Sequence, residues 1–111
     1  MSEEEEVDRL FHALADATRR DIVRAALDGE QSVSALARRY PMSVTAVQKH
    51  VGVLEAARLV TKHRQGREQL VRGELDMIRY AHILLDQFEA IWRDRLQRFA
   101  DVLSDDEGAN E

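Results

Sequence analysis

The side chains best suited to chemistry in this chain are polar groups that recur at helical spacing after residue 43. At about 100° per residue of an α-helix, one side of the stretch 43–57 is polar and consists of Thr45, Gln48, Lys49 and Gly52. The opposite side is apolar and carries Val47, Val51 and Leu54. Hydroxyl, carboxamide and ammonium groups hydrogen-bond to base edges, where Gln pairs with adenine and Lys prefers guanine. An ordinary amphipathic surface helix would show the same periodicity, so the neighbouring segments must decide between these two interpretations.

The start of this helix is predicted at Ser43. Ser43 is a good N-cap, and it directly follows Pro41-Met42, which ends the preceding element. The apolar arc is widened by Val44, Ala46, Val53 and Ala57. A helix with polar side chains on its first two turns fits the major groove of DNA. The expected DNA contacts of this recognition helix, 43–57, are Ser43, Val44, Thr45, Gln48 and Lys49.

The next segment changes from a helical to a strand-like pattern. Two short runs, 59–64 and 67–72, are separated by Gln65-Gly66, and Gly66 can supply the positive φ of a tight turn. Three basic residues surround the predicted tip: Lys62, Arg64 and Arg67. We predict a β-hairpin wing over 60–72. Its basic side chains should bind phosphates or the minor groove and add affinity more than specificity.

Capping residues indicate three helices before residue 41. Their expected extents are about 2–14, 17–28 and 32–39, with N-caps at Ser2, Asp16 and Ser32. Gly29 should end the second helix in the left-handed conformation, and Pro41 prevents the third from continuing. With the recognition helix and the hairpin, these elements predict a mainly α winged helix-turn-helix.

A long last helix is expected from Leu75 to Leu103. Apolar residues repeat at every seventh position, starting with Ile78, Leu85, Trp92 and Phe99. A second copy would cover so long a stripe, although the helix could instead wrap around its own core. We predict a homodimer through the first and last helices, with interface residues Leu10, Phe11, Ile78, Leu85, Phe88, Trp92 and Phe99.

Composition limits the class of protein. A chain of 111 residues with 44% hydrophobic residues and no internal linker predicts one small domain, whose modest core favours oligomerisation. The absence of Cys excludes disulfides and thiolate metal sites. The absence of an apolar signal region and of a long apolar run predicts a cytoplasmic protein. The expected division is an acidic N-terminal segment, 1–8, a DNA-binding and dimerisation domain, 9–103, and a disordered acidic tail, 104–111.

The net charge of −5 conceals a basic middle. Five acids precede residue 9 and five follow residue 100, whereas all 16 Lys and Arg lie between Arg9 and Arg98 with 11 acids, giving this part +5. Between Arg38 and Arg72, eight bases face two acids, a net charge of +6. This concentration is typical of a nucleic-acid-binding surface.

Several of these residues together resemble the ArsR family of winged-helix repressors. The resemblance covers about residues 8–103 and rests on Leu14-Ala15-Asp16-Ala17-Thr18-Arg19-Arg20, on Pro41-Met42-Ser43, on Ala46-Val47 and on His50 with Val53-Leu54. It is strongest for metal-independent members with a central Trp in the last helix, here Trp92. It implies a homodimeric bacterial transcription factor with 43–57 in the major groove and the hairpin as wing.

This chain departs from the family pattern at three positions. Ala17 stands where Pro is frequent, which is harmless in a first helical turn. Val44 stands where Arg is frequent, so one contact to DNA is missing. Arg58 stands where Gly is usual, so we expect either a strained backbone or a shifted helix end.

The chain shows no enzyme signature, because it lacks a phosphate-binding Gly-rich loop, a Cys nucleophile and a useful His–acid pair. His82 and Asp86 are four residues apart, a spacing that is more typical of a surface contact. A metal site needs three or four convergent ligands, and His82 is the only His on the last helix. We therefore expect no metal and no cofactor.

Two functions remain open at this stage. The first is a dimeric, sequence-specific regulator that binds double-stranded DNA, with the word repressor supplied by the resemblance alone. The second is a protein–protein interaction module on a winged-helix scaffold, which the acidic ends and a pI of about 5.4 favour. The operator, the regulated genes and any effector small molecule are not predicted.

Overall fold

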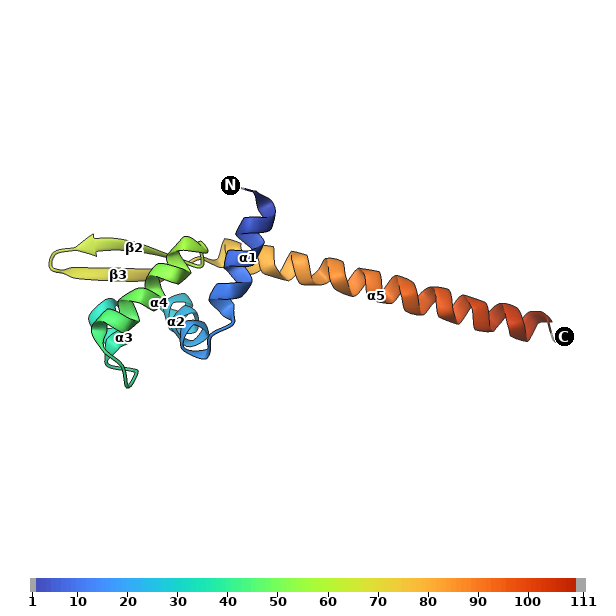
Figure 1. Cartoon of the computed structure of the whole chain (residues 1–111), viewed down its shortest axis with the longest axis horizontal. Helices are drawn as coiled ribbons and strands as arrows, with labels where there is room; N and C mark the ends of the chain where they lie inside the picture. Colours follow the sequence, from blue (N-terminus) through green and yellow to red (C-terminus); the bar gives the residue numbers. More distant parts are fainter. Residues whose placement is uncertain (1, 110–111) are drawn as a thin grey trace. The chain divides into compact units, whose positions relative to one another are not determined.

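The computed structural model describes residues 2–109, and those residues form five helices and three strands (Figure 1). In chain order the elements are α1 (Glu3–Leu14), α2 (Ala17–Asp28), β1 (Gln31–Ser32), α3 (Val33–Ala37), α4 (Val44–Ala56), β2 (Val60–Gln65), β3 (Glu68–Gly73) and α5 (Leu75–Ala109). The chain divides into a unit that ends at Ile78 and a second unit that begins at Arg79. The predicted mainly α winged helix-turn-helix is confirmed in the first unit.

Helices begin where the sequence predicts caps. The side-chain oxygens of Ser2, Asp16, Ser32 and Ser43 each accept a hydrogen bond from the backbone amide three residues later, at 3.0–3.2 Å. Each cap satisfies an amide that has no partner inside its helix. The predicted N-terminal boundary of the domain, at residue 9, falls inside α1.

Two predicted helix ends are wrong. Gly29 has φ 178° and ψ 153°, an extended rather than a left-handed conformation. The Gln31 side chain takes over the capping, because its Nε2 donates to the carbonyls of Ala25 and Gly29 at 3.5 and 3.1 Å. The last helix continues past Leu103 to Ala109, through most of the predicted disordered tail, and residues 110–111 of that tail lie outside the described residues.

The sheet has three antiparallel strands in the order β1-β3-β2, one more than the predicted hairpin. β1 is only two residues long, too short for an alternating pattern, and pairs Gln31 with Val71. In the hairpin Gln65 pairs with Glu68, so the loop is Gly66-Arg67 and not the predicted Gln65-Gly66. Gly66 has φ 63°, as a type II′ turn requires at its first loop position.

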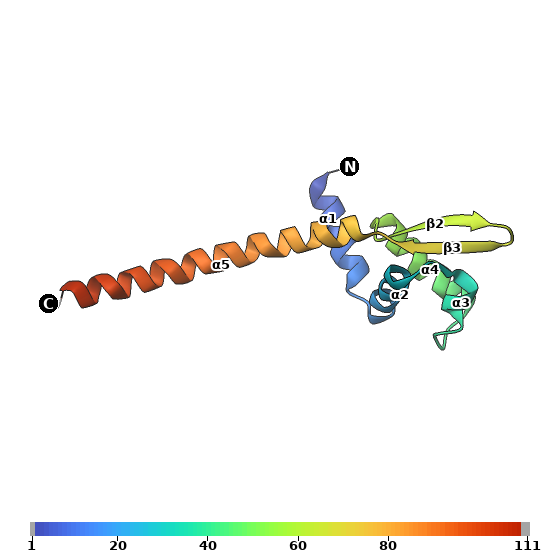
Figure 2. The same ribbon diagram turned by 180° about the vertical axis from the view of Figure 1, so that it is seen from behind.

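The core of the first unit lies between α1–α4 and the inner face of the sheet. Its largest fully buried residues are Leu10, Ile22, Leu36, Val47, Val51, Leu54, Leu59, Val60 and Val71. The end of β3 runs close to α2, because a Cβ built on Gly73 would lie 2.8 Å from the backbone nitrogen of Leu27. Figure 2 shows from behind how α2 and α4 flank the base of the β2–β3 hairpin.

Burial corrects two sequence assignments. Leu10 is completely buried within its own chain, so it belongs to the core of the protomer and not to an interface with another copy. Val44 was assigned to the apolar arc, but half of its surface is exposed, because it is the first residue of α4 and lies beyond the edge of the core.

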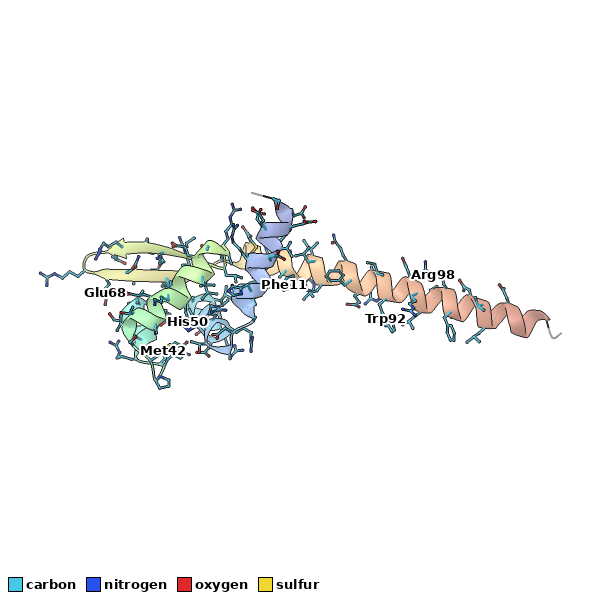
Figure 3. All side chains as sticks on the ribbon, viewed as in Figure 1. Phe11, Met42, His50, Glu68, Trp92 and Arg98 are labelled. Atoms are coloured by element: carbon cyan, nitrogen blue, oxygen red, sulfur yellow. The ribbon has the colours of Figure 1, made fainter. Side chains whose placement is uncertain are left out.

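Within the second unit, α5 carries a row of exposed large apolar side chains. Leu85, Phe88, Ile91, Trp92, Leu96, Phe99 and Val102 are each 49–65% exposed. In Figure 3 the Trp92 side chain stands out from the α5 ribbon, and Arg95 lies over its ring at 6.0 Å from the centroid. No helix in the described part of the chain is long and apolar enough to cross a membrane.

Candidate nucleic-acid interface

The polar face of α4 is turned to solvent. Ser43, Thr45, Gln48 and Lys49 are exposed, whereas Val47, Val51 and Leu54 on the opposite face are at most 1% exposed. The buried face anchors the helix against α2 and α3, and the outward face remains available along its first two turns. The side chains named from the sequence therefore lie together on one accessible surface.

An acidic side chain of α2 holds the segment that leads into α4. The Tyr40 hydroxyl donates a hydrogen bond to Oδ2 of Asp21 at 2.5 Å, and Nη2 of Arg39 donates to the same oxygen at 3.3 Å. The hydrogen bond from Tyr40 and the Arg39 guanidinium keep the pKa of Asp21 below its usual value. Burial and the Asp21 carboxylate raise the pKa of Tyr40. These contacts fix the chain just before Pro41 and Ser43, and so the position of the α4 N-terminus.

A guanidinium group connects three helices behind the α4 surface. Arg19 donates from Nε to the Ala13 carbonyl at 2.8 Å and from Nη2 to the His12 carbonyl at 3.0 Å, capping the end of α1. Its Nη1 lies 3.2 Å from Nδ1 of His50 on α4. Because a guanidinium can only donate hydrogen bonds, Arg19 is the donor in this contact. His50, labelled in Figure 3, thus links α4 to α1 and α2 through Arg19.

An ion pair joins the recognition helix to the wing. Nζ of Lys62 on β2 lies 3.2 Å from Oε1 of Glu55 on α4, and only 25% of the Lys62 side chain is exposed. Lys62, Gln48 and Gln69 also line a surface hollow of about 230 Å³ between α4 and the hairpin. Of the three basic wing residues predicted to contact DNA, Lys62 is therefore bound to Glu55 of the same chain.

The other two basic residues of the wing lie at the hairpin tip. Arg64 is exposed on β2, and Arg67 is the second residue of the two-residue loop. Neither has an ion pair among the contacts of the described residues. The tip of the β2–β3 hairpin projects beyond α4 in both views of the chain (Figures 1 and 2).

The end of α4 is strained, one of the two expectations from the sequence. Arg58 has φ 62°, in the left-handed region where glycine is usual. Its amide donates to the Glu55 carbonyl at 3.0 Å, and the next amide, of Leu59, donates to the Leu54 carbonyl at 3.0 Å. This Schellman-type ending turns the chain directly from α4 into β2.

The described residues offer no cluster of three or more His, Cys, Asp or Glu that could hold a metal ion. The His82–Asp86 pair on α5 is a surface contact at 3.9 Å, with both side chains more than half exposed.

Sequence reasoning missed the residues that position this surface rather than form it. Arg19 was noted only as part of a motif, and neither Asp21 nor Tyr40 was singled out. The contacts of Arg19 with His50 and of Asp21 with Tyr40 join residues 31 and 19 positions apart, so no local pattern could have paired them.

The chain is similar to known regulators over most of its length. A family described as "Helix-turn-helix domain" matches residues 14–63. The HTH-type transcriptional regulator Rv2034 of Mycobacterium tuberculosis is 37% identical over 101 residues, which cover 91% of each chain.

Two solved structures extend the comparison. The ArsR-like transcriptional regulator from Rhodococcus sp. RHA1 has a TM-score of 0.82 and 32% identity, covering 90% of this chain and 92% of that one. The homodimeric winged helix-turn-helix DNA-binding domain of Mb0332 from Mycobacterium bovis has a TM-score of 0.65 and 25% identity, covering 80% of this chain and 88% of that one.

Proposed function

The chain belongs to the ArsR family of winged helix-turn-helix transcriptional regulators, and we propose that it is a dimeric repressor that binds a palindromic operator in double-stranded DNA. The observation that carries this proposal is the exposed polar face on the first two turns of α4, whose back is anchored in the core. Regulation of this kind takes place in the bacterial cytoplasm, where the chromosome lies.

Specificity comes from α4 in this proposal. Gln48 and Lys49 meet base edges in the major groove, where Gln pairs bidentately with adenine and Lys binds guanine. Thr45 offers a hydroxyl to a neighbouring base, and Ser43 lies where the α4 N-terminus meets a phosphate. Three attachments support this assignment: the Asp21–Tyr40 hydrogen bond, the Arg19–His50 contact and the buried valines keep this face in one orientation.

In this proposal the wing supplies affinity for DNA that does not depend on its sequence. Arg64 and Arg67 contact phosphates or the minor groove with guanidinium groups that make no ion pair among the described residues. Lys62 contributes less than these two, because Glu55 already compensates its charge. Neutralising phosphates releases counterions, so the wing makes affinity depend on salt.

Self-association rests on α5 in this proposal. The exposed row that includes Leu85, Phe88, Trp92 and Phe99 is far more apolar than a solvated helix face needs to be. Phe11 is 37% exposed on α1 and is a further candidate, whereas Ile78 is half-buried in the first unit. Mb0332, described as homodimeric, supports a two-fold arrangement. A two-fold dimer binds half-sites about one helical turn of DNA apart, which is why a palindrome is proposed.

We also propose that DNA binding needs no metal. The chain has no Cys and a single His on α5. The affinity for operator DNA should therefore be equal in EDTA and in added zinc, measured by fluorescence anisotropy. A saturable, stoichiometric effect of zinc on the affinity would contradict this.

The proposal is tested by selecting sequences from a duplex library with a random central region of about 20 base pairs, at low and at moderate salt. Enrichment of an inverted repeat, with an affinity that falls steeply as salt rises, is the expected result. If the protein bound neither the duplex library nor a heparin column, the alternative of a protein–protein interaction module would be favoured instead. Repression is then measured with a reporter gene placed behind the selected sequence.

A further inference from the structure

Val44 is the one large apolar side chain that α4 leaves exposed in the described structure, with half of its surface accessible. It is the first residue of α4, directly after the Ser43 cap, and the exposed polar residues Thr45 and Gln48 follow it. A single exposed valine elsewhere would need no explanation. Here it lies at the end of a recognition helix that comes nearest to the bases.

The major groove displays one apolar group, the C5-methyl of thymine. We propose that Val44 reads a thymine by packing its two methyl groups against that C5-methyl. The inference rests on the proposed function, since it requires α4 to lie in the major groove. It assigns the residue that stands in place of the family's frequent Arg a specificity role of its own.

The rigidity of the side chain favours this role. Val is branched at Cβ, so within a helix it has one strongly preferred χ1 rotamer and loses little freedom on contact. Ser43 Oγ fixes the helix start by accepting from the Ala46 amide at 3.1 Å, and the Tyr40–Asp21 hydrogen bond holds the preceding chain. The methyl groups of Val44 are therefore presented in one place.

The spacing to Gln48 predicts where the thymine lies. Residues four apart lie on the same helix face, about 6 Å apart along the helix axis. Because base pairs are stacked about 3.4 Å apart, Val44 should contact a thymine within about two base pairs of the base read by Gln48.

The experiment uses the full chain and the sequence it selects from the random library. Each thymidine is replaced in turn by deoxyuridine, which removes only the C5-methyl and keeps the base pair. Replacing the contacted thymidine in one half-site should weaken binding of the wild type about fourfold, the effect of one buried methyl group, and replacing it in both half-sites about 16-fold. Val44→Ala should bind the thymidine duplex more weakly by a similar factor and should be insensitive to that replacement.

Three further variants make the result specific. Val44→Thr keeps the side-chain volume but exchanges one methyl for a hydroxyl, so it should lose part of the sensitivity to deoxyuridine. Val44→Arg should bind all duplexes more tightly at low salt, through phosphates, and also lose that sensitivity. Ile83→Ala shortens a similarly exposed branched side chain on α5 and should keep the wild-type sensitivity. Thermal unfolding confirms that each variant is folded.

Three results would overturn the inference. If no deoxyuridine replacement affects the wild type, no thymine methyl is read. If Val44→Ala remains as sensitive as the wild type, another side chain reads it, and Thr45→Ser, which removes the methyl group of the neighbouring exposed residue, tests whether Thr45 is that side chain. Both results leave the proposed function standing. Failure of the wild type to select any sequence would instead overturn the proposed function and this inference together.

Discussion

At the scale of single residues, the proposed function assigns sequence reading to the outward face of α4 and added affinity for DNA to the hairpin tip. Gln48 is exposed on the outward face of α4, next to the fully buried Val47. Arg67 is in the Gly66-Arg67 loop at the hairpin tip, and its proposed contact is to a phosphate or to the minor groove. Truncating these two side chains to alanine should therefore affect DNA binding in different ways.

Gln48→Ala should lower the affinity for the selected operator by about 1–3 kcal/mol and relax preference at one base pair per half-site. Arg67→Ala should weaken operator and scrambled DNA about equally and make the log–log salt slope shallower by about one unit for each lost phosphate contact. Salt titrations of both variants on both DNAs measure this. If Gln48→Ala weakened both DNAs equally while Arg67→Ala affected the operator alone, the groove assignment would be reversed.

Arg58 tests the strain at the end of α4. With φ 62°, it adopts a conformation that costs a non-glycine residue about 1–2 kcal/mol. Arg58→Gly should raise the free energy of unfolding by about 0.5–1 kcal/mol, after allowing for the greater freedom of glycine in the unfolded chain.

The matched control for this change is Arg58→Ala. Both variants lose the ion pair between Arg58 and Glu6, which at 3.8 Å on an exposed side chain contributes little. Only glycine relieves the strain. Equal stabilities of the two variants in urea unfolding would show that the backbone at this position is relaxed.

At the scale of elements, the winged helix-turn-helix depends on a few contacts that hold α4 against its neighbours. Arg19 ties α4 to α1 and α2, Asp21 and Tyr40 tie the α3–α4 connection to α2, and Glu55–Lys62 ties α4 to β2. None of these side chains is proposed to touch a base. They determine the angle at which the α4 face is presented, so their loss should affect stability and binding together.

Tyr40→Phe removes the main cause of the lowered pKa of Asp21. The Asp21 side chain is 35% exposed, so solvent screening reduces the contribution of this hydrogen bond to about 1–2 kcal/mol of stability at neutral pH. A carboxylate whose pKa is lowered by folding stabilises the fold above its usual pKa and loses that contribution as pH falls through the folded value. The difference in stability between wild type and Tyr40→Phe should therefore narrow below about pH 4.

Urea unfolding at neutral pH and at about pH 3 measures this difference. A double-mutant cycle with Asp21→Asn separates the Tyr40–Asp21 coupling from the separate effects of each residue. A difference that stays constant across this range would mean that Tyr40 stabilises the protein by packing and not through the carboxylate.

At the scale of the whole molecule, the exposed apolar row of α5 has no partner within the described chain. Trp92 should contribute most to the proposed dimer, because that dimer would bury a large aromatic side chain that is 55% exposed in one protomer. Trp92→Ala should destabilise the folded dimer by on the order of 3–5 kcal/mol.

Light scattering over a range of micromolar concentrations, with unfolding measured at each, tests this expectation. Ile83→Ala is the control, since Ile83 is 53% exposed on the same helix but outside the sevenfold repeat. A wild-type protein that remains monomeric at these concentrations would contradict the proposed dimer.

The sequence alone determined the features that depend on neighbouring residues. Cap residues followed by apolar residues at helical spacing predicted the starts of α1, α2 and α4, and the α4 periodicity separated its buried valines from its exposed polar side chains. These predictions held because capping and amphipathicity act within a few residues. The family resemblance, in which glycine is usual at this helix end, left strain or a shifted end as the two expectations for Arg58, and the strain is observed.

Tertiary structure decided what depends on residues distant in sequence. The two-residue strand β1 exists only because β3 offers it partners. Val44 is exposed because the core ends before the first turn of α4. Lys62 is not free to contact DNA as Arg64 and Arg67 are, because it forms an ion pair with Glu55. Such outcomes follow from packing between elements, which no local pattern encodes.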